Sequence, residues 1–260
     1  MKYEVITSMN EELYNVIGHK MISSFLENWP EDAVLWVYME EDFTIPENSR
    51  IVKSSIQDDP AFQEFVSRHS KRFDQLNKKE LHKGAIRFAP KSFTIFNHCI
   101  ETDTDFVIWM DSDIETFAPM NKNFINSLVR EGVYTTFLGR EDTFTEGGLV
   151  VYNVKHEKNE AFMEHWRIMY EFDQVFRLDE WHDCAIFDYL RNRLLTEEEQ
   201  LNLSPWGRGF EHVFNNSILG AYMDHMKGPR KELGHSYFED LSLEIATPQA
   251  IERYEKWKKG

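Results

Sequence analysis

Short apolar runs alternate with amphipathic stretches over the first 115 residues, and this alternation restricts the fold more than any other feature of the sequence. Strands are predicted at residues 2–7, 33–40 and 105–113, and helices from Asn10 through Phe25, over residues 58–75, and from Pro90 through Ile100. Proline opens the last helix because it is tolerated in a first turn. Successive strand–helix–strand units give parallel strands with right-handed connections, so the pattern predicts a doubly wound α/β sheet flanked by helices.

The second half of the chain continues the α/β pattern less regularly. Strands are predicted at residues 133–138 and 149–152, and helices at residues 157–171, 182–195 and 216–227. The sequence contains no internal repeat, no low-complexity tract and no linker rich in Gly, Pro or Ser that would separate domains. We therefore expect a single domain, with the charged and loosely patterned segment 232–260 as a peripheral element on it.

Composition argues against several other classes of protein. The 260 residues include 29 basic and 45 acidic side chains, and the net charge of −16 argues against a broad electrostatic grip on nucleic acid or on an anionic membrane. Two cysteines, Cys99 and Cys184, are too few for a disulfide scaffold or a metal site of four cysteines. No apolar run approaches the roughly 20 residues that span a bilayer, and the N-terminus does not read as a signal peptide. These features predict a cytoplasmic protein.

A pair of carboxylates follows the clearest strand. Asp111 and Asp113 flank Ser112 directly after the apolar residues 106–110. Ligands of α/β sheets bind beyond the carboxyl ends of the strands, and a turn at Ser112 would let both carboxylates reach one cation. Oxygen ligands with open positions suit Mg²⁺ or Mn²⁺. The alternative is that Asp111 caps the next segment while Asp113 is solvated; the place at a strand end favours the metal site.

A basic run near the end of the chain contains a histidine. Residues 225–231 read His-Met-Lys-Gly-Pro-Arg-Lys. His225 could complete the coordination of a metal held by the aspartates, Gly228 would let backbone approach a ligand, and Arg230 and Lys231 could meet phosphate charge. The alternative is an ordinary helix terminus whose cations answer the helix dipole.

Together these motifs carry a resemblance to known enzymes. The segment DFVIWMDSDIETF with the late HMKGPRK resembles the GT-A fold glycosyltransferases, especially the glycogenin and bacterial lipooligosaccharide galactosyltransferase group, whose members carry Asp-x-Asp after a hydrophobic strand and a late His-x-x-Gly-x-x-Lys. TEGGLVVYNVKH resembles their segment in which a glycine, here Gly148, precedes a short strand ending in Asn, here Asn153. EWHDCAIFD resembles the acceptor-side helix start of related phage and capsule-type transferases.

This resemblance implies a fold and an activity. The fold would be a GT-A, Rossmann-like, mostly parallel twisted sheet, with residues 1–115 binding the nucleotide sugar and residues 116–231 the acceptor within one domain. Asp111, Asp113 and His225 would hold Mn²⁺ or Mg²⁺, which binds the donor diphosphate. The reaction would be transfer of a hexose from a nucleoside diphosphate sugar, by family habit a UDP-sugar, to a glycan or similar acceptor, with retention of configuration.

Further residues are candidates for the donor side of such a site. Thr7 and Ser8 leave the first strand where a nucleoside would lie, and Tyr14 is within reach of its base. Arg87 and Lys91 lie in the helix before the metal strand, where the resembled enzymes place basic residues against the donor. Ser112, Gly228, Arg230 and Lys231 complete this cofactor-binding set. The alternative for Thr7, Ser8 and Tyr14 is a simple helix-entry turn that places Tyr14 in the core. The alternative for Arg87 and Lys91 is pairing with the acidic surface of the protein.

Two other segments are candidates for the acceptor side. Glu146, Gly147 and Gly148 combine a carboxylate with two positions that lack Cβ, which suits close approach by a sugar, or an ordinary turn. Trp181, His182 and Asp183 put a flat apolar face beside an acid. We predict Asp183 as the catalytic carboxylate, steadying an oxocarbenium-like state in a retaining enzyme or acting as general base in an inverting one. Alternatively, Asp183 caps the helix that starts there.

Three rival functions differ from this interpretation. A nucleotidyltransferase would need a Gly-rich first loop with Arg and Lys, but residues 7–12 read Thr-Ser-Met-Asn-Glu-Glu. A nucleic-acid-modifying transferase would need a basic stripe, and none is evident. A non-catalytic sugar-binding module would keep the aromatic residues without a metal site. The predicted partners are a nucleoside diphosphate sugar and a glycan or small-molecule acceptor.

Overall fold

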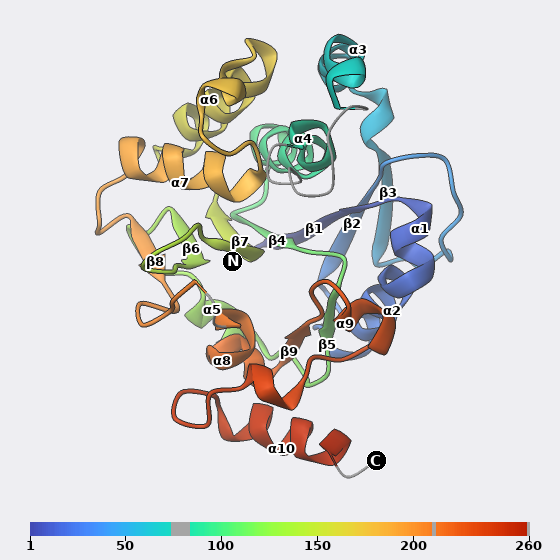
Figure 1. The fold of residues 1–260 in the computed structure, drawn as a ribbon, viewed down its shortest axis with the longest axis vertical. Coiled ribbons are helices and arrows are strands. Elements are labelled where there is room, and N and C mark those ends of the chain that lie inside the picture. The colour runs from blue at the N-terminus through green and yellow to red at the C-terminus, as the bar shows by residue number, and fades with distance from the viewer. Residues whose placement is uncertain (74–83, 210–211, 259–260) are drawn as a thin grey trace.

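The computed structural model describes residues 1–73, 84–209 and 212–258, and a seven-stranded sheet in the order β3-β2-β1-β4-β7-β6-β8 forms its centre (Figure 1). Its strands are β1 Tyr3–Met9, β2 Val34–Met39, β3 Ile51–Ser55, β4 Phe106–Met110, β6 Thr135–Leu138, β7 Glu146–Asn153 and β8 Gln200–Asn202. Strands β1 to β4 are mutually parallel and β8 is parallel to β6, whereas β7 runs antiparallel to both β4 and β6. The predicted mostly parallel sheet in a single domain is confirmed.

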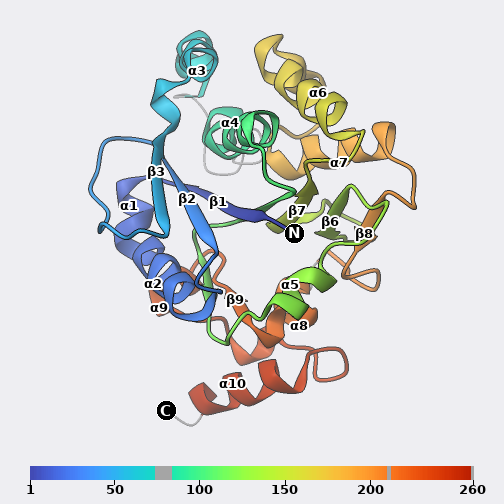
Figure 2. The same ribbon diagram turned by 180° about the vertical axis from the view of Figure 1, so that it is seen from behind.

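Helices cover both faces of the sheet (Figure 2). One layer contains α3 Pro60–Phe73, α4 Ala85–Glu101, α6 Asn159–Glu171 and α7 Asp183–Leu194. The other contains α1 Glu11–Leu13, a π-helical turn at Tyr14–Gly18, α2 His19–Asn28, α5 Lys122–Ser127, α8 Val213–Asn216, α9 Arg230–Leu233 and α10 Pro248–Lys258. A small sheet of β5 Ile114–Thr116 and β9 Met223–His225 belongs to this second layer. Among the described residues, 3₁₀ turns lie at Ile56–Asp58, Gln174–Arg177, Ile218–Ala221 and Phe238–Asp240.

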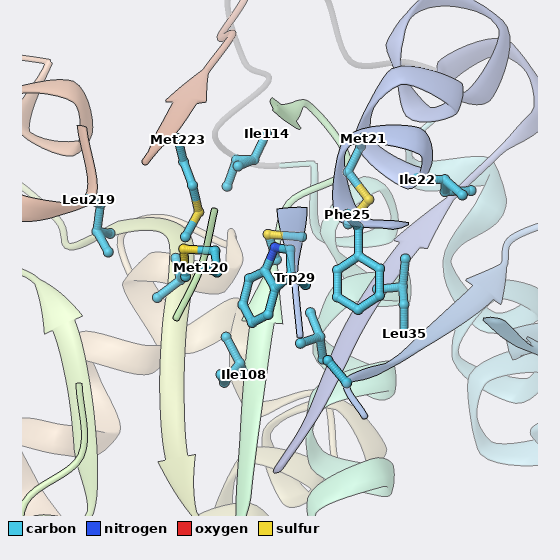
Figure 3. Packing of buried hydrophobic residues seen from close by; sticks show 14 of the residues in the cluster. Met21, Ile22, Phe25, Trp29, Leu35, Ile108, Ile114, Met120, Leu219 and Met223 are labelled. Atoms are coloured by element: carbon cyan, nitrogen blue, oxygen red, sulfur yellow. The ribbon is translucent and has the colours of Figure 1, made fainter. Parts of the chain in front are cut away.

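Alternate residues of the central strands enter two separate cores. Val5 and Ile108 contribute to the core under α2 and the small sheet, where Figure 3 shows Ile108 near Trp29, with Phe25 and Met223 in the same cluster. Ile6 and Trp109 contribute to the core under the α3, α4, α6 and α7 layer. Burial on both faces explains why these strands are near-continuous apolar runs, as expected of parallel strands. Within the described residues, every helix is too short or too polar to cross a membrane.

The predicted helix at residues 216–227 is wrong. The chain instead forms a 3₁₀ turn at Ile218–Ala221 and then the strand β9, whose His225 pairs with Ile114 of β5. The buried Asn215 explains the change: its amide donates to Asp224 Oδ1 at 2.8 Å and to the Tyr254 hydroxyl at 2.7 Å, and its Oδ1 accepts from the His225 amide at 3.1 Å. These bonds commit the backbone to an extended path that helical periodicity alone cannot reveal.

Other differences concern helix ends and short strands. Helix α4 begins at Ala85, so Pro90 lies inside it rather than opening it; Ala85 and Ala89 are fully buried, and their packing offsets the backbone hydrogen bond that proline removes. Asn10 caps its helix as predicted, accepting from the Leu13 amide at 2.8 Å. The strands β3, β5, β8 and β9 were not predicted. The predicted residues 74 and 75 of the third helix lie outside the described residues.

Candidate active site

A cavity of about 380 Å³ opens at the carboxyl ends of the parallel strands. Ser8 at the end of β1, Glu40 after β2 and Asp111 after β4 line it. Because β7 is antiparallel, its first residues Glu146 and Gly147 come to the same edge of the sheet and also line the cavity. This is the edge at which ligands of open α/β sheets bind.

Two aspartates and a histidine converge in this cavity. One ligand atom each from Asp111, Asp113 and His225 lies within 4.8 Å of the others. His225 Nε2 is 3.1 Å from Asp113 Oδ1 and 3.7 Å from Asp111 Oδ2. The pairing of β9 with β5 brings the histidine here across more than 110 residues of sequence. Carboxylate oxygens with one imidazole nitrogen suit Mn²⁺ or Mg²⁺, so these residues fit a divalent cation.

Gly148 and Glu146 lie against the Nδ1 side of the His225 ring. A Cβ at Gly148 would lie 2.6 Å from His225 Cε1 and Nδ1, closer than real Cβ atoms approach, so the ring can occupy this place only above a glycine. The ring's buried Nδ1 lies 3.2 Å from Glu146 Oε1, and Glu146 also pairs with Lys227. No described residue hydrogen-bonds to this nitrogen, which faces away from the aspartates; Glu146 is close to it, in the place where a carboxylate orients a metal-binding histidine.

Lys91 joins the aspartate pair to a third carboxylate. Its Nζ lies 2.9 Å from Asp111 Oδ1, 2.8 Å from Asp183 Oδ2 and 2.7 Å from the Gly147 carbonyl. Burial alone would lower the pKa of Lys91, but the charges of Asp111 and Asp183 raise it above its ordinary value. The pKa of Asp183 is lowered although burial opposes this, because Lys91 is so close. Both groups are therefore charged at neutral pH.

A second lysine contacts the Asp113 oxygen that His225 does not contact. Lys231 Nζ is 2.8 Å from Asp113 Oδ2. Burial would raise the pKa of Asp113, but His225 and Lys231 hold it well below its usual range. The carboxylate is thus ionised and available as a metal ligand over the physiological pH range.

Sequence comparisons alone identify no relative: no protein-family model and no curated protein matches the chain. Solved structures do share its architecture. WbbM, a bifunctional glycosyltransferase, matches with a TM-score of 0.54 at 11% identity over 98% of this chain, which spans 51% of that protein. The galactosyltransferase LgtC, solved with donor and acceptor sugar analogs, matches with a TM-score of 0.52 at 12% identity over 87% of both chains. The fold is of the GT-A type.

A third match supports the same fold. A glycosyltransferase involved in glycosylation of the major capsid of PBCV-1 has a TM-score of 0.51 at 12% identity over 90% of this chain and 98% of its own. At this level of identity the likeness is one of fold, and it confirms the GT-A resemblance drawn from the motifs.

Most of the residues predicted from the sequence line the cavity of this GT-A fold: Ser8, Arg87, Lys91, Asp111, Ser112, Asp113, Glu146, Gly147, His182, Asp183, His225, Gly228 and Lys231. A side chain at position 147 would be crowded, since a Cβ there would lie 3.0 Å from both Asp183 Oδ2 and Lys91 Nζ. Gly228 has a φ of +56°, which a side chain would strain.

Three predicted donor-side residues lie outside the cavity lining: Thr7, Tyr14 and Arg230. Thr7 is fully buried in the sheet, because alternate residues of β1 face opposite sides and Ser8 is the one that reaches the cavity. Tyr14 packs against Phe43 at 5.5 Å between ring centroids, and Leu13 lines the cavity in its place. The predicted stacking of Tyr14 on a base has no support in this arrangement.

The predicted cation Arg230 and the predicted aromatic residue Trp181 are committed to other partners. Arg230 makes a two-pronged pair with Asp240, Nε to Oδ2 at 2.6 Å, and lies over the Tyr237 ring, so it faces the C-terminal segment. Trp181 packs edge-on against Phe176 at 5.0 Å and donates to the Leu178 carbonyl at 2.9 Å. Neither residue lines the cavity, unlike the expectation for both.

His182, rather than Asp183, caps helix α7. Its Nδ1 accepts from the Ala185 amide at 3.2 Å, and its Nε2 is paired with Glu180 at 2.8 Å. Both ring nitrogens are engaged, so His182 offers the cavity its ring face. His182, Asp183 and Cys184 also form a cluster of possible metal ligands, but the capping bond occupies the histidine.

Sequence reasoning missed several lining residues: Leu13, Glu40, Phe88, Trp109, Arg140, Thr145, Cys184 and Lys227. Glu40 is the last residue of the predicted strand 33–40, and Arg140 follows the predicted strand 133–138, so the same strand-end rule that selects Asp111 would have found them. Glu40 accepts from the Ser8 hydroxyl at 3.0 Å, and burial raises its pKa to about 6.

Proposed function

We propose that this protein is a metal-dependent glycosyltransferase that moves a hexose from a nucleoside diphosphate sugar to a glycan or similar acceptor. The observation that carries the proposal is the meeting of Asp111, Asp113 and His225 in one cavity, at the ligand-binding edge of a GT-A fold. The structural matches are glycosyltransferases, and one of them was solved with donor and acceptor sugar analogs.

These three residues would hold Mn²⁺ or Mg²⁺. When bound, the cation offsets the charge that grows on the departing nucleoside diphosphate. Lys231, now paired with Asp113, is placed to add a positive charge to the same phosphates once the cation neutralises the carboxylate. Gly228, with its left-handed backbone and no Cβ, leaves room for phosphate between Lys231 and His225.

Asp183 would act at the reacting carbon. Its lowered pKa makes it a poor general base, because a base works best with a pKa near the operating pH. A permanently ionised carboxylate is suited to stabilising the positive charge of an oxocarbenium-like state. This supports retention of configuration over inversion, with Lys91 holding the carboxylate in place at 2.8 Å.

The remaining features of the proposal follow the resemblance in sequence. Residues 1–115 would bind the nucleotide sugar, with UDP as its carrier, and residues 116–231 the acceptor. In support, Ser8, Glu40 and Asp111 line the cavity from the first part, and Arg140 and Asp183 line it from the second. The location in the cytoplasm stays a prediction.

Thermal unfolding with nucleotides tests the proposal. UDP, GDP, CDP and ADP are each added with and without Mn²⁺ to the wild type, to Asp113→Asn, and to Asp103→Asn as a control whose side chain is fully exposed. A ligand at about 100 times its Kd adds roughly 2.7 kcal/mol, which raises the midpoint by several degrees. We expect a Mn²⁺-dependent shift with UDP that Asp113→Asn loses and Asp103→Asn keeps. No shift with any nucleotide would refute the proposal.

A further inference from the structure

Among the described residues, no carboxylate pairs with Arg140, a cation that lines the cavity. It lines the cavity directly after β6, and its Nε donates to the Phe144 carbonyl at 2.8 Å. Within the part of the chain that the structure describes, no carboxylate lies within 4.0 Å of its guanidinium. The lysines of the same cavity are all paired: Lys91 with Asp111 and Asp183, Lys227 with Glu146, and Lys231 with Asp113.

The nearby acids are committed elsewhere. Asp188 accepts from the Thr145 amide at 2.7 Å and pairs with Arg191 at 2.6 Å, and Asp142 accepts from the Gly209 amide at 2.7 Å. Arg140 is more than half withdrawn from water, and burial lowers its pKa, yet a guanidinium stays protonated in proteins. A half-buried positive charge with free N–H groups therefore faces the cavity.

The loop that carries Arg140 is held firmly, so the charge is positioned. Asp188 fixes Thr145 through both its amide and its hydroxyl, the latter at 2.5 Å. The intervening Phe144 packs edge-on against His182 at 4.8 Å, and its carbonyl fixes the guanidinium. Because the Nε edge is held, the two terminal nitrogens are left to a ligand, in the planar fork that matches carboxylate and phosphate oxygens.

Arg140 lies at the Asp183 end of the cavity. Phe144, whose carbonyl holds the Arg140 Nε, packs on His182, the residue before Asp183, whereas Lys231 pairs with Asp113 at the proposed diphosphate end. Phe88 and His182, whose rings lie 5.8 Å apart, give this end aromatic faces against which a sugar can pack.

We propose that Arg140 recognises an acidic acceptor sugar, one that bears a carboxylate or a phosphate ester near the hydroxyl that receives the hexose. This inference rests on the proposed function and narrows its acceptor class. The guanidinium binds the acidic group in a two-pronged contact, and the ring of the same sugar lies against the faces of Phe88 and His182. A neutral sugar would give the terminal nitrogens of Arg140 no charged partner.

The test measures binding of matched sugar pairs to protein loaded with Mn²⁺ and UDP. The methyl glycosides of glucose and galactose are compared with those of the corresponding uronic acids and 6-phosphates, by the shift of the thermal midpoint. A second arm compares UDP-glucose with UDP-glucuronic acid. The variants are Arg140→Gln and, as a matched control, Arg193→Gln, an exposed arginine of α7 that lies over the Tyr189 ring.

We expect at least one acidic glycoside to bind about ten-fold or more tightly than its neutral parent, the scale of a charge-assisted hydrogen bond. Arg140→Gln abolishes this preference while its UDP shift stays that of the wild type, and Arg193→Gln keeps the preference. The inference is overturned if no acidic glycoside binds better than its parent, if Arg140→Gln keeps the preference, or if only the donor pair shows it. Loss of the UDP shift in the wild type would instead refute the proposed function.

Discussion

At the scale of single residues, the position of Asp183 is decided by one lysine. Lys91 reaches Asp183, Asp111 and the Gly147 carbonyl within 2.9 Å, so it ties the proposed reacting end of the cavity to the proposed metal end. Both carboxylates therefore share one buried cation.

Replacing Asp183 separates its chemical role from donor binding. Asp183→Asn keeps the shape of the side chain but removes its charge, so we expect sugar transfer to fall roughly 10²-fold or more. Binding of UDP with Mn²⁺ remains, since Lys91 stays paired with Asp111. Initial rates and nucleotide titrations measure the two effects, with the exposed Asp179→Asn as control. Turnover close to that of the wild type would remove Asp183 from catalysis.

A glycine is required behind His225, and this too can be tested by one substitution. Gly148→Ala places a Cβ 2.6 Å from the His225 ring, so the ring must turn away from Asp111 and Asp113. We expect Mn²⁺ affinity to fall about ten-fold or more, as when the support of a ligating histidine is lost. Gly132→Ala is the control: its φ of +76° costs stability, but its Cβ meets nothing. Equal Mn²⁺ affinity in both variants would contradict the proposed support.

At the scale of elements, one arginine closes the end of helix α2. Arg50 donates to the carbonyls of Leu26, Trp29, Pro30 and Ala33 at 2.9 to 3.2 Å, and it lies 5.1 Å from the centre of the Phe25 ring. It thereby satisfies one carbonyl of the last helical turn, that of Leu26, and three carbonyls of the segment that follows, and it joins α2 to the start of β3.

Removing this arginine should destabilise the protein without touching the cavity. For Arg50→Ala we expect the free energy of unfolding to fall by about 2–3 kcal/mol, since charge-assisted hydrogen bonds to buried carbonyls are lost. Urea unfolding measures the loss. Lys122→Ala, which breaks an exposed pair with Asp32, should cost less than about 1 kcal/mol. If the two variants lose the same stability, Arg50 is not the clamp that its contacts indicate.

At the scale of the whole molecule, the two cores share one sheet. Trp29 belongs to the core under α2 and Trp166 to the core under α6, and the strands β1 and β4 contribute side chains to both. Each core contains side chains from both proposed halves of the domain, residues 1–115 and 116–231. Neither half can keep a core without the other, so we expect unfolding to be cooperative.

Single-tryptophan variants report on each core separately. In urea, the fluorescence of Trp29 and of Trp166 should change with one midpoint, and the far-UV circular dichroism should follow the same curve. Two separate midpoints would show that the faces unfold independently and that the sheet does not couple them.

How much could be predicted depended on how local each signal is. The long strands and helices follow from periodicity, and Asp111, Asp113 and Asp183 follow from their places at a strand end and a helix start. The helix predicted at 216–227 was wrong because Asn215 exchanges hydrogen bonds with Asp224, His225 and Tyr254, the last of them 39 residues away. Arg230 was assigned to phosphate because its partner Asp240 is not visible in a local motif.

The sequence by itself determined a mostly parallel α/β sheet and the motifs that lie at its carboxyl edge, because strand ends and helix caps are set by neighbouring residues. Only the tertiary structure decided which long side chains meet in the cavity. Lys91, Arg140 and Lys231 each have several rotatable bonds, and their partners lie on other elements, so their pairing depends on packing that no local pattern encodes. The state of Arg140 follows from the same cause: among the described residues, the three lysines of the cavity meet carboxylates and Arg140 does not.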